Sequence, residues 1–506
     1  MSNAKRREKM TTPSVRPIIL FRPISSAMYR QGEVPVQLLA IARMFLPAYD
    51  VRIISAELGL VRQTDDEVRH NIEAHLENCL FFGVTVMTGY GLYQAMAMTR
   101  FVRERAPGVK IVWGGWHASL LPEKTIEQSG ADFVVIGQGE YTIKELADAL
   151  ERGESDFSPI KGLAWKQGDR IVLNQARPSA DLNALPPMPY HLLGDCAFEQ
   201  IRNVRSAGMY TSIGCPFRCG FCADAAVYGS KWRGISRERA SEEMRRLRDE
   251  HGVQVIRILD SNFFADWDRG VAILQAMRQW GLRAQFVNAR VETLLRAKQE
   301  HLQLFRDTVD FFLVGAESGD DDLLASINKH QTVDSIKQLA AVFTENGIAI
   351  NFSFLVGLPF KTEAVQKEMQ VFYDMADEIL TKSRFLHRVQ IHVYTPYPGT
   401  PLFENAVQLG FSPPTQIEDW AKMELFATKL PYLPLHFADR IEFITTFVLQ
   451  LTRPDYRFYQ GNNRLLGAFF AIIQAMFQLS ANFRWRRKFF SWPVEFRLVK
   501  MLLSRH

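Results

Sequence analysis

"GCPFRCGFC", residues 214–222, places Cys215, Cys219 and Cys222 on one short loop. The chain has 506 residues but only five cysteines, and the other two lie far away in the sequence. A secreted protein with disulfides would carry more cysteines, usually an even number. The opening stretch "MSNAKRREKM" is polar and basic and lacks the apolar core of a secretion signal. We therefore expect a reducing cytoplasm, in which the thiolates are kept for a metal.

The spacing of these cysteines supplies three ligands, one fewer than a structural zinc site or a complete four-iron cluster needs. The closest downstream histidine, His251, follows about thirty residues later, beyond an expected helix. Three thiolates on a tight loop favour a [4Fe–4S] cluster with one iron open to a small molecule. Pro216 and Gly220 let the loop curl, and Phe221 can cover a ligand. The alternatives are a zinc knuckle, or cysteines that share a loop by chance.

Six apolar runs, separated by helical patterns, begin just before this loop and continue after it. Such a repetition predicts β–α units and a parallel sheet in the form of a partial (β/α)6 barrel. Ligands gather at the carboxyl ends of the strands in such a barrel, where this chain has polar residues such as Asn288 and Arg290. The expected strands are "MYTSI" (209–213), "VQVIRILD" (253–260), "AQFVNAR" (284–290), "FFLVGAE" (311–317), "IAINFSFLVG" (348–357) and "HRVQIHVY" (387–394).

The cysteine loop resembles the cluster loop of radical S-adenosylmethionine (SAM) enzymes, whose open iron binds the amino and carboxylate groups of SAM. Five later stretches are similar to one branch of this family. The resemblance covers about residues 205–410 and implies a radical SAM domain with a [4Fe–4S] cluster. The stretches are "LDSNF", "VGAESGDD", "INKHQT", "FLVGLPFKT" and "TPYPGTPLFE".

The resemblance also implies which residues bind SAM. Glu317 and Ser318 would approach the methionine or the ribose, and Gly357 would let the adenosine approach the backbone closely. Asp260 and Asn262 would line the cavity. The alternative for each of them is an ordinary solvated residue, because strand ends are commonly polar. The predicted SAM-binding residues are Phe221, Asp260, Asn262, Glu317, Ser318 and Gly357.

Residues 17–150 alternate apolar strands with amphipathic helices five times. Five such units predict an open, doubly wound Rossmann-like sheet that binds its ligand at the carboxyl ends of the strands. Glycines follow three strands, at "TVMTGYG" (85–91), "GGWHAS" (114–119) and "GQGE" (137–140), and would let a bulky ligand lie against the backbone. None of these turns forms G-x-G-x-x-G, which disfavours nicotinamide cofactors. A purely structural role in turns is the alternative.

The pair "WGGWHASLLPEKT" and "DFVVIGQGEYTIKEL" closely resembles the cobalamin-binding domain that precedes the barrel in B12-dependent radical SAM enzymes. The D-x-H-x-x-G motif, whose histidine binds cobalt from below in other cobalamin proteins, is absent from this chain. That branch of the family commonly lacks the motif too. The resemblance implies cobalamin with its nucleotide tail tucked into the sheet and no histidine on cobalt. The implied cobalamin-binding residues are Thr85, Gly114, Gly115, Gly137, Gln138 and Gly139.

These patterns predict an α/β chain that is divided into five segments. Two of them are the domains described above, and the last is expected to be mainly helical. The segments are a polar basic tail (1–16), a cobalamin-binding domain (17–150), a linker with a hairpin around Gly168 (151–204), a radical SAM domain (205–415) and a basic, aromatic-rich C-terminal region (416–506).

The C-terminal stretch from Arg453 to His506 carries ten Lys or Arg against two acidic residues, whereas the whole chain has a net charge of +5. Residues 465–483 are uncharged, but they contain polar side chains such as Gln474 and Gln478, which disfavour a membrane-spanning helix. Basic and aromatic residues together favour a helix at a membrane interface. The first alternative is a helix packed on the barrel with solvated basic residues. Nucleic-acid binding is a weaker one, because no recognised module is present.

Together these features predict a cytoplasmic enzyme that can contact the inner membrane face peripherally. The family resemblance implies cleavage of SAM to a 5′-deoxyadenosyl radical and methyl transfer from methylcobalamin to an unactivated carbon. The expected partners are a small, hydrophobic substrate and an electron donor such as flavodoxin or ferredoxin, without nucleic acid. Oxidative cyclisation or ring rearrangement, for example of a tetrapyrrole, is the alternative within the family. A non-catalytic cobalamin sensor is the alternative from another class, although a sensor has no need of three iron ligands.

Overall fold

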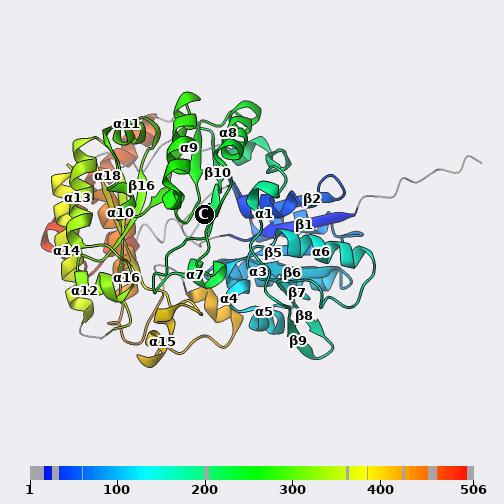
Figure 1. The fold of residues 1–506 in the computed structure, drawn as a ribbon. Helices are drawn as coiled ribbons and strands as arrows, with labels where there is room; N and C mark the ends of the chain where they lie inside the picture. Colours follow the sequence, from blue (N-terminus) through cyan, green and yellow to red (C-terminus); the bar gives the residue numbers. More distant parts are fainter. Residues whose placement is uncertain are drawn as a thin grey trace, which may run out of the picture.

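The computed structural model shows two α/β parts side by side, with the last helices of the chain packed on the second part (Figure 1). The first part is blue and cyan in the figure, and the second is green and yellow. The structure describes residues 16–24, 34–59, 61–198, 204–360, 364–384, 386–423, 428–453 and 464–497.

A seven-stranded sheet forms the first part, in the order β2-β1-β5-β6-β7-β8-β9. Strands β2, β1, β5, β6 and β7 pair in parallel, so their carboxyl ends lie at one edge. The strand order reverses between β1 and β5, and doubly wound sheets bind ligands at such a switch point. The strands are β1 (Pro17–Arg22), β2 (Asp50–Ser55), β5 (Phe81–Thr85), β6 (Lys110–Gly114), β7 (Phe133–Val135), β8 (Leu163–Gln167) and β9 (Arg170–Leu173); β3 (Glu57–Leu58) and β4 (Val61–Arg62) form a separate small hairpin.

Helices cover both faces of this sheet because successive strand residues point to opposite sides. In β1, Ile19 and Phe21 belong to one apolar core, whereas Ile18 and Leu20 belong to another. The predicted doubly wound sheet is therefore confirmed. Its helices are α1 (Val36–Ala42), α2 (Asp65–Glu73), α3 (Gly91–Arg105), α4 (Trp116–Leu120), α5 (Pro122–Ser129) and α6 (Glu140–Glu151).

The hairpin predicted around Gly168 is present, and Gly168 has a positive φ of 61°. Its first strand, β8, pairs with β7 in antiparallel orientation. The hairpin therefore extends the first sheet and does not lie in a separate linker. Packing explains this position, because Trp165 is buried and its ring centroid lies 5.3 Å from that of Phe157.

The second part is a partial barrel made of a three-stranded and a four-stranded sheet, with the orders β10-β13-β14 and β15-β16-β17-β18. All neighbouring strands within both sheets are parallel. The fold class predicted from the alternating pattern is confirmed. The strands are β10 (Ser206–Met209), β13 (Val255–Ile258), β14 (Arg283–Gln285), β15 (Val287–Ala289), β16 (Phe312–Glu317), β17 (Ile350–Val356) and β18 (Arg388–Val393).

Two strands differ from the sequence prediction. The run expected as one strand over 284–290 is split into β14 and β15 at Phe286, which has a φ of 56° and whose ring lies 4.4 Å from the Arg257 guanidinium. The first barrel strand ends at Met209, and the chain then forms β11 (Ser212–Ile213). This short strand pairs with β12 (Arg233–Gly234) in antiparallel orientation, so the cysteine loop lies inside a closed loop of chain.

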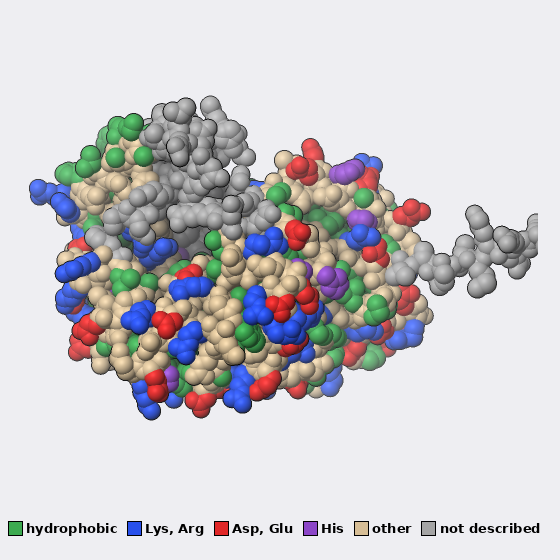
Figure 2. Space-filling view, turned by 90° about the horizontal axis from the view of Figure 1, so that it is seen from above, with side chains coloured by type: hydrophobic (Ala, Val, Ile, Leu, Met, Phe, Trp, Pro, Cys, Tyr) green, Lys and Arg blue, Asp and Glu red, His purple; other side chains and the backbone are tan. Residues whose placement is uncertain are grey.

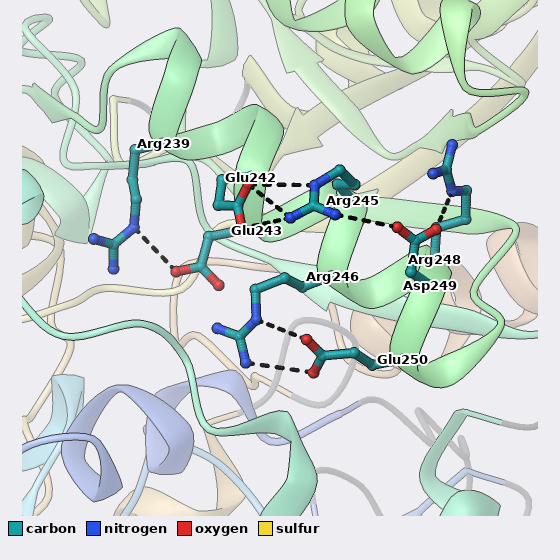
Figure 3. A network of polar contacts seen from close by, with 8 residues as sticks. All are labelled: Arg239, Glu242, Glu243, Arg245, Arg246, Arg248, Asp249 and Glu250. Carbon is teal, nitrogen blue, oxygen red and sulfur yellow. Dashed lines mark hydrogen bonds and ion pairs between the residues drawn. The ribbon is translucent and has the colours of Figure 1, made fainter.

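The barrel helices include α8 (Arg237–His251), which carries several ion pairs, most of them between residues three or four positions apart (Figure 3). Such pairs contribute about 0.3–0.5 kcal/mol each and support the helix rather than the site. The other helices are α7 (Ala223–Tyr228), α9 (Trp267–Gln279), α10 (Val291–Leu294), α11 (Gln299–Thr308), α12 (Asp321–Ser326), α13 (Val333–Glu345), α14 (Ala364–Lys382) and α15 (Pro401–Gln408).

The C-terminal region is helical, as expected. It begins with a 3-10 turn, η6 (Ile417–Lys422), which docks on the first part through an ion pair between Arg100 and Glu418. The remaining helices are α16 (Phe437–Phe443), a π-helical turn η7 (Ile444–Val448), α17 (Leu449–Leu451) and α18 (Arg464–Arg487). No helix within the described residues is long and apolar enough to cross a membrane.

Candidate functional site

The cysteine loop is held by backbone contacts at Gly214 and Gly220, and at Gly214 only a glycine fits. Gly214 has a φ of 77°, and a Cβ atom there would lie 2.0 Å from the carbonyl oxygen of Lys231. Gly220 donates its N–H to the Ile327 carbonyl, and its own carbonyl accepts from Leu402. The loop therefore bridges the helices that follow β16 and β18, close to the carboxyl ends of the barrel strands.

All five cysteines carry free thiols, and the three of the loop lie close enough to influence one another. Burial raises the pKa of Cys222 to about 12, and the neighbouring Cys219 and Cys215 thiols add to the shift. Burial likewise raises the pKa of Cys215. In the described part of the chain, no three His, Cys, Asp or Glu side chains are arranged as a ready metal site. The loop thus supplies three soft thiolate donors, which fit an iron–sulfur cluster. The three side chains are not already arranged in the positions of cluster ligands.

A cation lies directly against the loop. Arg290, at the end of β15, donates from Nη1 to Sγ of Cys219 over 3.6 Å. Its guanidinium carbon lies 3.8 Å from the centroid of the Phe217 ring, and its Nη2 donates to the carbonyl of Lys329. The sequence placed Arg290 at a strand end but did not connect it with Cys219. The same guanidinium pairs through Nε with the Glu292 carboxylate, so Arg290 presents the cationic side of an ion pair to Cys219.

A second cation belongs to a buried ion pair. Nζ of Lys329 lies 2.8 Å from Oε1 of Glu317, and the two side chains are only 9% and 10% exposed. Burial lowers the pKa of Lys329, but the charges of Glu317 and Cys219 outweigh this effect and leave it raised. Gly315 makes the arrangement possible, because a Cβ atom there would lie 2.1 Å from the Glu317 carboxylate. Glu317 is therefore held by Lys329, a partner that sequence reasoning missed.

The two predicted residues after β13 have different surroundings. Asp260 is fully buried and accepts three hydrogen bonds of 2.6 Å, from the Thr211 N–H and from the Thr211 and Ser212 hydroxyls. This carboxylate therefore fixes the chain before the cysteine loop. The side-chain amide of Asn262 is also buried, yet neither its nitrogen nor its oxygen has a partner. A buried amide without partners is costly, so Asn262 suits a ligand that supplies a donor and an acceptor.

Gly357 follows β17 and has a φ of 75°. The space that a Cβ atom would take is filled by Leu433, whose Cδ1 would lie 2.8 Å away. The Gly357 N–H donates to Oε2 of Glu368 over 2.6 Å. Burial raises the pKa of Glu368 to about 7, against the lowering effect of its bonds to the Gly357 and Leu358 N–H groups. Gly357, the residue predicted to contact adenosine, thus lies beside Leu433 and Glu368, two neighbours that the sequence did not indicate.

The other two predicted SAM contacts flank the ion pair. The Phe221 ring is half-buried, and Nζ of Lys329 lies 6.0 Å from its centroid. The hydroxyl of Ser318 accepts a hydrogen bond from the N–H of Asp320 over 3.1 Å. Both residues lie at the carboxyl end of the barrel, close to the cysteine loop.

The predicted cobalamin residues all lie at the carboxyl edge of the first sheet, after β5, β6 and β7. Gly115 has a φ of 92°, and a Cβ atom there would lie 2.6 Å from the Val86 carbonyl, so the backbone itself requires this glycine. Ser119 joins two of the turns, because its hydroxyl donates to the Gly115 carbonyl and accepts from the Gly137 N–H. Gln138 accepts a bond from the Ala180 N–H, while its buried side-chain nitrogen has no partner.

At the other three predicted cobalamin-binding residues, the surrounding structure restricts the choice of side chain less tightly. Thr85 is the last residue of β5 and is only partly buried. At Gly114, an added Cβ atom would make ordinary contacts of 3.7 Å or more with Val135. At Gly139 it would lie 3.0 Å from a Val135 methyl group, so this glycine allows close packing of α6.

A buried histidine lies beside the same edge and was not singled out from the sequence. His117 of α4 is 1% exposed, and its Nδ1 lies 3.0 Å from the Thr88 hydroxyl. Burial lowers its pKa to about 4, so the ring is neutral near pH 7. Its ring also contacts Trp420 of the C-terminal region, at 6.1 Å between centroids. The signal in the sequence was a histidine two positions after the glycine pair, in "GGWH".

The two candidate sites face each other. The Trp116 ring of α4 lies 6.4 Å from the Tyr228 ring of α7, the helix that begins directly after Cys222. A Cβ atom on Gly137 would lie 3.8 Å from the carbonyl oxygen of Val227 in the same helix. The carboxyl edge of the first sheet therefore contacts the helix that carries on from the cysteine loop. The two candidate sites therefore share one interface between the two α/β parts.

Two family models match the chain: the radical SAM superfamily over residues 209–371 and the B12 binding domain over residues 29–147. An uncharacterized methyltransferase of Pyrococcus horikoshii, PH0819, is 30% identical over 401 residues, covering 77% of this chain and 83% of that protein. The chain belongs to the radical SAM superfamily, in the branch whose members carry a B12-binding domain.

A second relative is the anaerobic magnesium-protoporphyrin IX monomethyl ester cyclase of Synechocystis, 25% identical over 64% of this chain and 65% of that protein. Among solved structures, the radical SAM methyltransferase TsrM of Kitasatospora setae matches with a TM-score of 0.61 at 17% identity, over 79% of this chain and 76% of that one. The TsrM likeness supports the fold. The matches confirm the predicted family, an enzyme rather than a sensor, and cofactors of the kinds expected.

Proposed function

We propose that this protein is a B12-dependent radical SAM methyltransferase that methylates an unactivated carbon of a small, hydrophobic substrate. The observation that carries the proposal is the contact between the carboxyl edge of the first sheet and α7, seen in the Trp116–Tyr228 ring pair. When bound, SAM with its cluster supplies a carbon-centred radical and cobalamin supplies a methyl group. The substrate carbon has to meet both within one closed site, and this interface is where the two domains can enclose it.

Cys215, Cys219 and Cys222 are proposed to hold the cluster. The three cysteines leave one coordination position open, which is needed for SAM to bind there. Arg290 and Lys329 place their cationic groups near Cys219, and each of them is also paired with a carboxylate, Glu292 and Glu317 respectively. These side chains would hold the loop closed around the cluster and keep water away from it.

For SAM, the contact best supported by the structure is Asn262, whose buried amide lacks protein partners. We assign Asp260 a positioning role, because the three hydrogen bonds of its carboxylate all come from Thr211 and Ser212, just before the cysteine loop. The Glu317 carboxylate is oriented by Lys329 and would reach SAM only through its second oxygen. Phe221, Ser318 and Gly357 are proposed to complete the SAM-binding surface.

Cobalamin is proposed to lie along the carboxyl edge of the first sheet. The unpartnered side-chain nitrogen of Gln138 offers a donor for the ligand, and the glycine turns keep side chains away from it. His117 is bonded to Thr88 and would support the edge without binding cobalt. The other proposed contacts are Thr85, Gly114, Gly115, Gly137 and Gly139.

Radical formation from SAM consumes one electron that no residue of the chain supplies, so we propose a reduced flavodoxin or ferredoxin as the donor. We also propose that the enzyme works in the cytoplasm and contacts a membrane surface peripherally. The free thiols support the reducing compartment. The surface of α18 supports the membrane contact, and nothing in the chain resembles a nucleic-acid module.

The two named relatives suggest the competing reactions, because PH0819 is called a methyltransferase and the Synechocystis protein a cyclase. A mass-spectral comparison of hydrophobic metabolites in cells with and without the gene would separate them. Methylation predicts pairs of compounds that differ by one CH2 unit, the larger of which disappears without the gene. Pairs that differ only in hydrogen or oxygen content would instead support cyclisation and contradict the proposal.

A further inference from the structure

Helix α18 packs one of its faces on the barrel. The Trp485 ring centroid lies 6.4 Å from that of Phe372 and 6.0 Å from that of Tyr373, both in α14. Nearer the start of the helix, the Phe477 ring lies 5.5 Å from that of Phe447 in η7. Ala481, between these contacts, is fully buried. Tertiary packing thus fixes the helix and determines which of its faces points outward.

The outward face of α18 is apolar. Ile472, Met476, Leu479 and Phe483 follow one another at intervals of four, three and four residues, the spacing of a single helix face. Their exposed fractions are 64%, 65%, 73% and 59%. A surface helix of a globular protein usually presents polar side chains to water. These four residues are called the apolar stripe below.

The segment that follows α18 adds to the same surface. Phe489, Trp492 and Val494 are 46%, 79% and 57% exposed. With the apolar stripe, they make up seven of the thirteen exposed large hydrophobic side chains in the described part of the chain. Such a concentration within residues 472–494 marks an interaction surface, because exposed apolar residues are otherwise scattered singly.

The charge next to the apolar stripe is positive. Arg486, Arg487 and Arg497 are exposed. Glu495 is the only acidic residue between 471 and 497, and its carboxylate is bound by Arg484 at 2.7 Å with 13% of its side chain exposed. Figure 2 shows hydrophobic and basic side chains side by side on the barrel end of the molecule. The surface therefore combines apolar side chains with three arginines that form no ion pair with the described residues.

We propose that the apolar stripe and the exposed arginines dock the enzyme on the surface of an anionic lipid bilayer, with α18 lying parallel to it. Apolar side chains at an interface insert at the level of the acyl chains, and cations bind the anionic headgroups. The inference deepens the membrane contact that forms part of the proposed function, and it does not depend on methyl transfer.

Charge favours a lipid surface over a second copy of the chain. A two-fold contact with parallel helices would bring the arginines of both copies close together, where like charges repel, and an antiparallel one would leave them without an opposite charge. An anionic bilayer instead gives each arginine an opposite charge. The partner is therefore the bilayer surface, and self-association becomes an outcome that the test must distinguish.

The test uses full-length protein loaded with its cofactors. Sedimentation is measured with vesicles of phosphatidylcholine alone and with vesicles that also contain phosphatidylglycerol. We expect binding to the anionic vesicles only. The Met476→Ser/Leu479→Ser variant should bind at least tenfold more weakly, because each large apolar side chain contributes about 1.5–3 kcal/mol. Arg486→Gln/Arg487→Gln should weaken binding about thirtyfold at low salt, at about 1 kcal/mol per charge.

Matched controls change residues outside this surface. Leu435→Ser removes a side chain that is 86% exposed, and Lys110→Gln/Lys166→Gln removes two exposed charges; both variants should bind like the wild type. The inference would be overturned if the wild-type protein did not bind anionic vesicles. It would also be overturned if the Met476→Ser/Leu479→Ser variant bound them as tightly as the wild type. If the wild type formed dimers but did not bind vesicles, and if the Met476→Ser/Leu479→Ser variant were monomeric, the surface would be one for self-association. SAM cleavage measured on the same samples separates a failure of docking from a failure of the proposed reaction.

Discussion

Lys329 and Glu317 form a buried ion pair, with 2.8 Å between Nζ and Oε1, beside the loop that carries Cys219. Twelve residues separate them in sequence, and the missing side chain of Gly315 leaves the room they need. Buried charges are tolerated when they are paired, so each side chain requires the other. The pair also places a positive charge close to the proposed cluster.

This relationship predicts a non-additive pattern of stability. Lys329→Met should lower the free energy of unfolding by about 3–5 kcal/mol, because it leaves Glu317 charged and buried without a partner. The double variant Lys329→Met/Glu317→Leu should lose clearly less, because neither charge remains. Chemical denaturation of the cofactor-free protein measures this. Losses that simply add up in the double variant would show that the two side chains act independently.

A second prediction concerns the cluster ligands. Anaerobically reconstituted protein should hold about four irons per chain, since three thiolates can bind a [4Fe–4S] cluster. Cys215→Ala, Cys219→Ala or Cys222→Ala should abolish the cluster and SAM cleavage. Iron analysis and electron paramagnetic resonance measure the result.

The other two cysteines provide the controls for this experiment. Cys79 is buried in the first part of the molecule, where desolvation raises its pKa to about 11, and Cys196 is exposed. Cys79→Ala and Cys196→Ala should keep the cluster. If either of them lost it, the assignment of the ligands would be wrong.

Gly137 provides a sharp test of the cobalamin site. Gly137 and Gly168 both have positive φ, 71° and 61°, and an added Cβ atom would meet nothing closer than 3.8 Å at either position. An alanine therefore introduces similar backbone strain of about 1–2 kcal/mol at both. We expect Gly137→Ala to weaken cobalamin binding and Gly168→Ala to leave it unchanged, by equilibrium dialysis. Equal affinities in the two variants would contradict the placement of the site.

Cobalt should bind no histidine, because the D-x-H-x-x-G motif is absent and His117 is bonded to Thr88. Spectra of protein labelled with 15N in histidine should show no nitrogen coupling to Co(II). His117→Ala should leave these spectra unchanged. A coupling that disappears in His117→Ala would instead make His117 the ligand.

Stability should also depend on pH through Glu368. Burial raises the pKa of Glu368 to about 7 in the folded protein. At pH values between the usual pKa of a glutamate and about 7, the folded protein therefore keeps a proton on Glu368 that the unfolded chain has released. The contribution of this group therefore decreases as the pH rises from about 4.5 to about 7, by up to about 3 kcal/mol. Glu368→Gln should flatten this part of the stability profile. An unchanged profile in the variant would show that another group is responsible.

Local patterns in the sequence were sufficient for most of the strands, the cysteine loop and the glycine turns, but not for the break at Phe286 or the end of β10 at Met209. The carboxyl ends of parallel strands meet at one edge, so residues such as Asn262 and Gln138 could be placed at these edges without coordinates. The hairpin around Gly168 was also evident from the sequence. The pairing of its first strand, β8, with β7 was not, because local alternation of apolar and polar residues does not say which strands pair.

The contacts that organise the site could not be predicted, because they join residues far apart in the chain. Arg290 and Cys219 are 71 positions apart, and the Asp260 bonds to the Thr211 backbone span 49 positions. Leu433 fills the space at Gly357 from the C-terminal region. Each of these contacts depends on how complete elements pack, and no single stretch of sequence contains that information.

Methyl transfer is tested by a single-turnover assay with SAM labelled on its methyl group. The enzyme is reduced under anaerobic conditions and supplied with a hydrophobic substrate found in the metabolite comparison. Methylation consumes two SAM molecules for each product, one giving 5′-deoxyadenosine and the other S-adenosylhomocysteine. We predict equal amounts of both by-products and the label in the product. Product formed with 5′-deoxyadenosine alone, and without label, would contradict methylation and support a radical cyclisation or rearrangement.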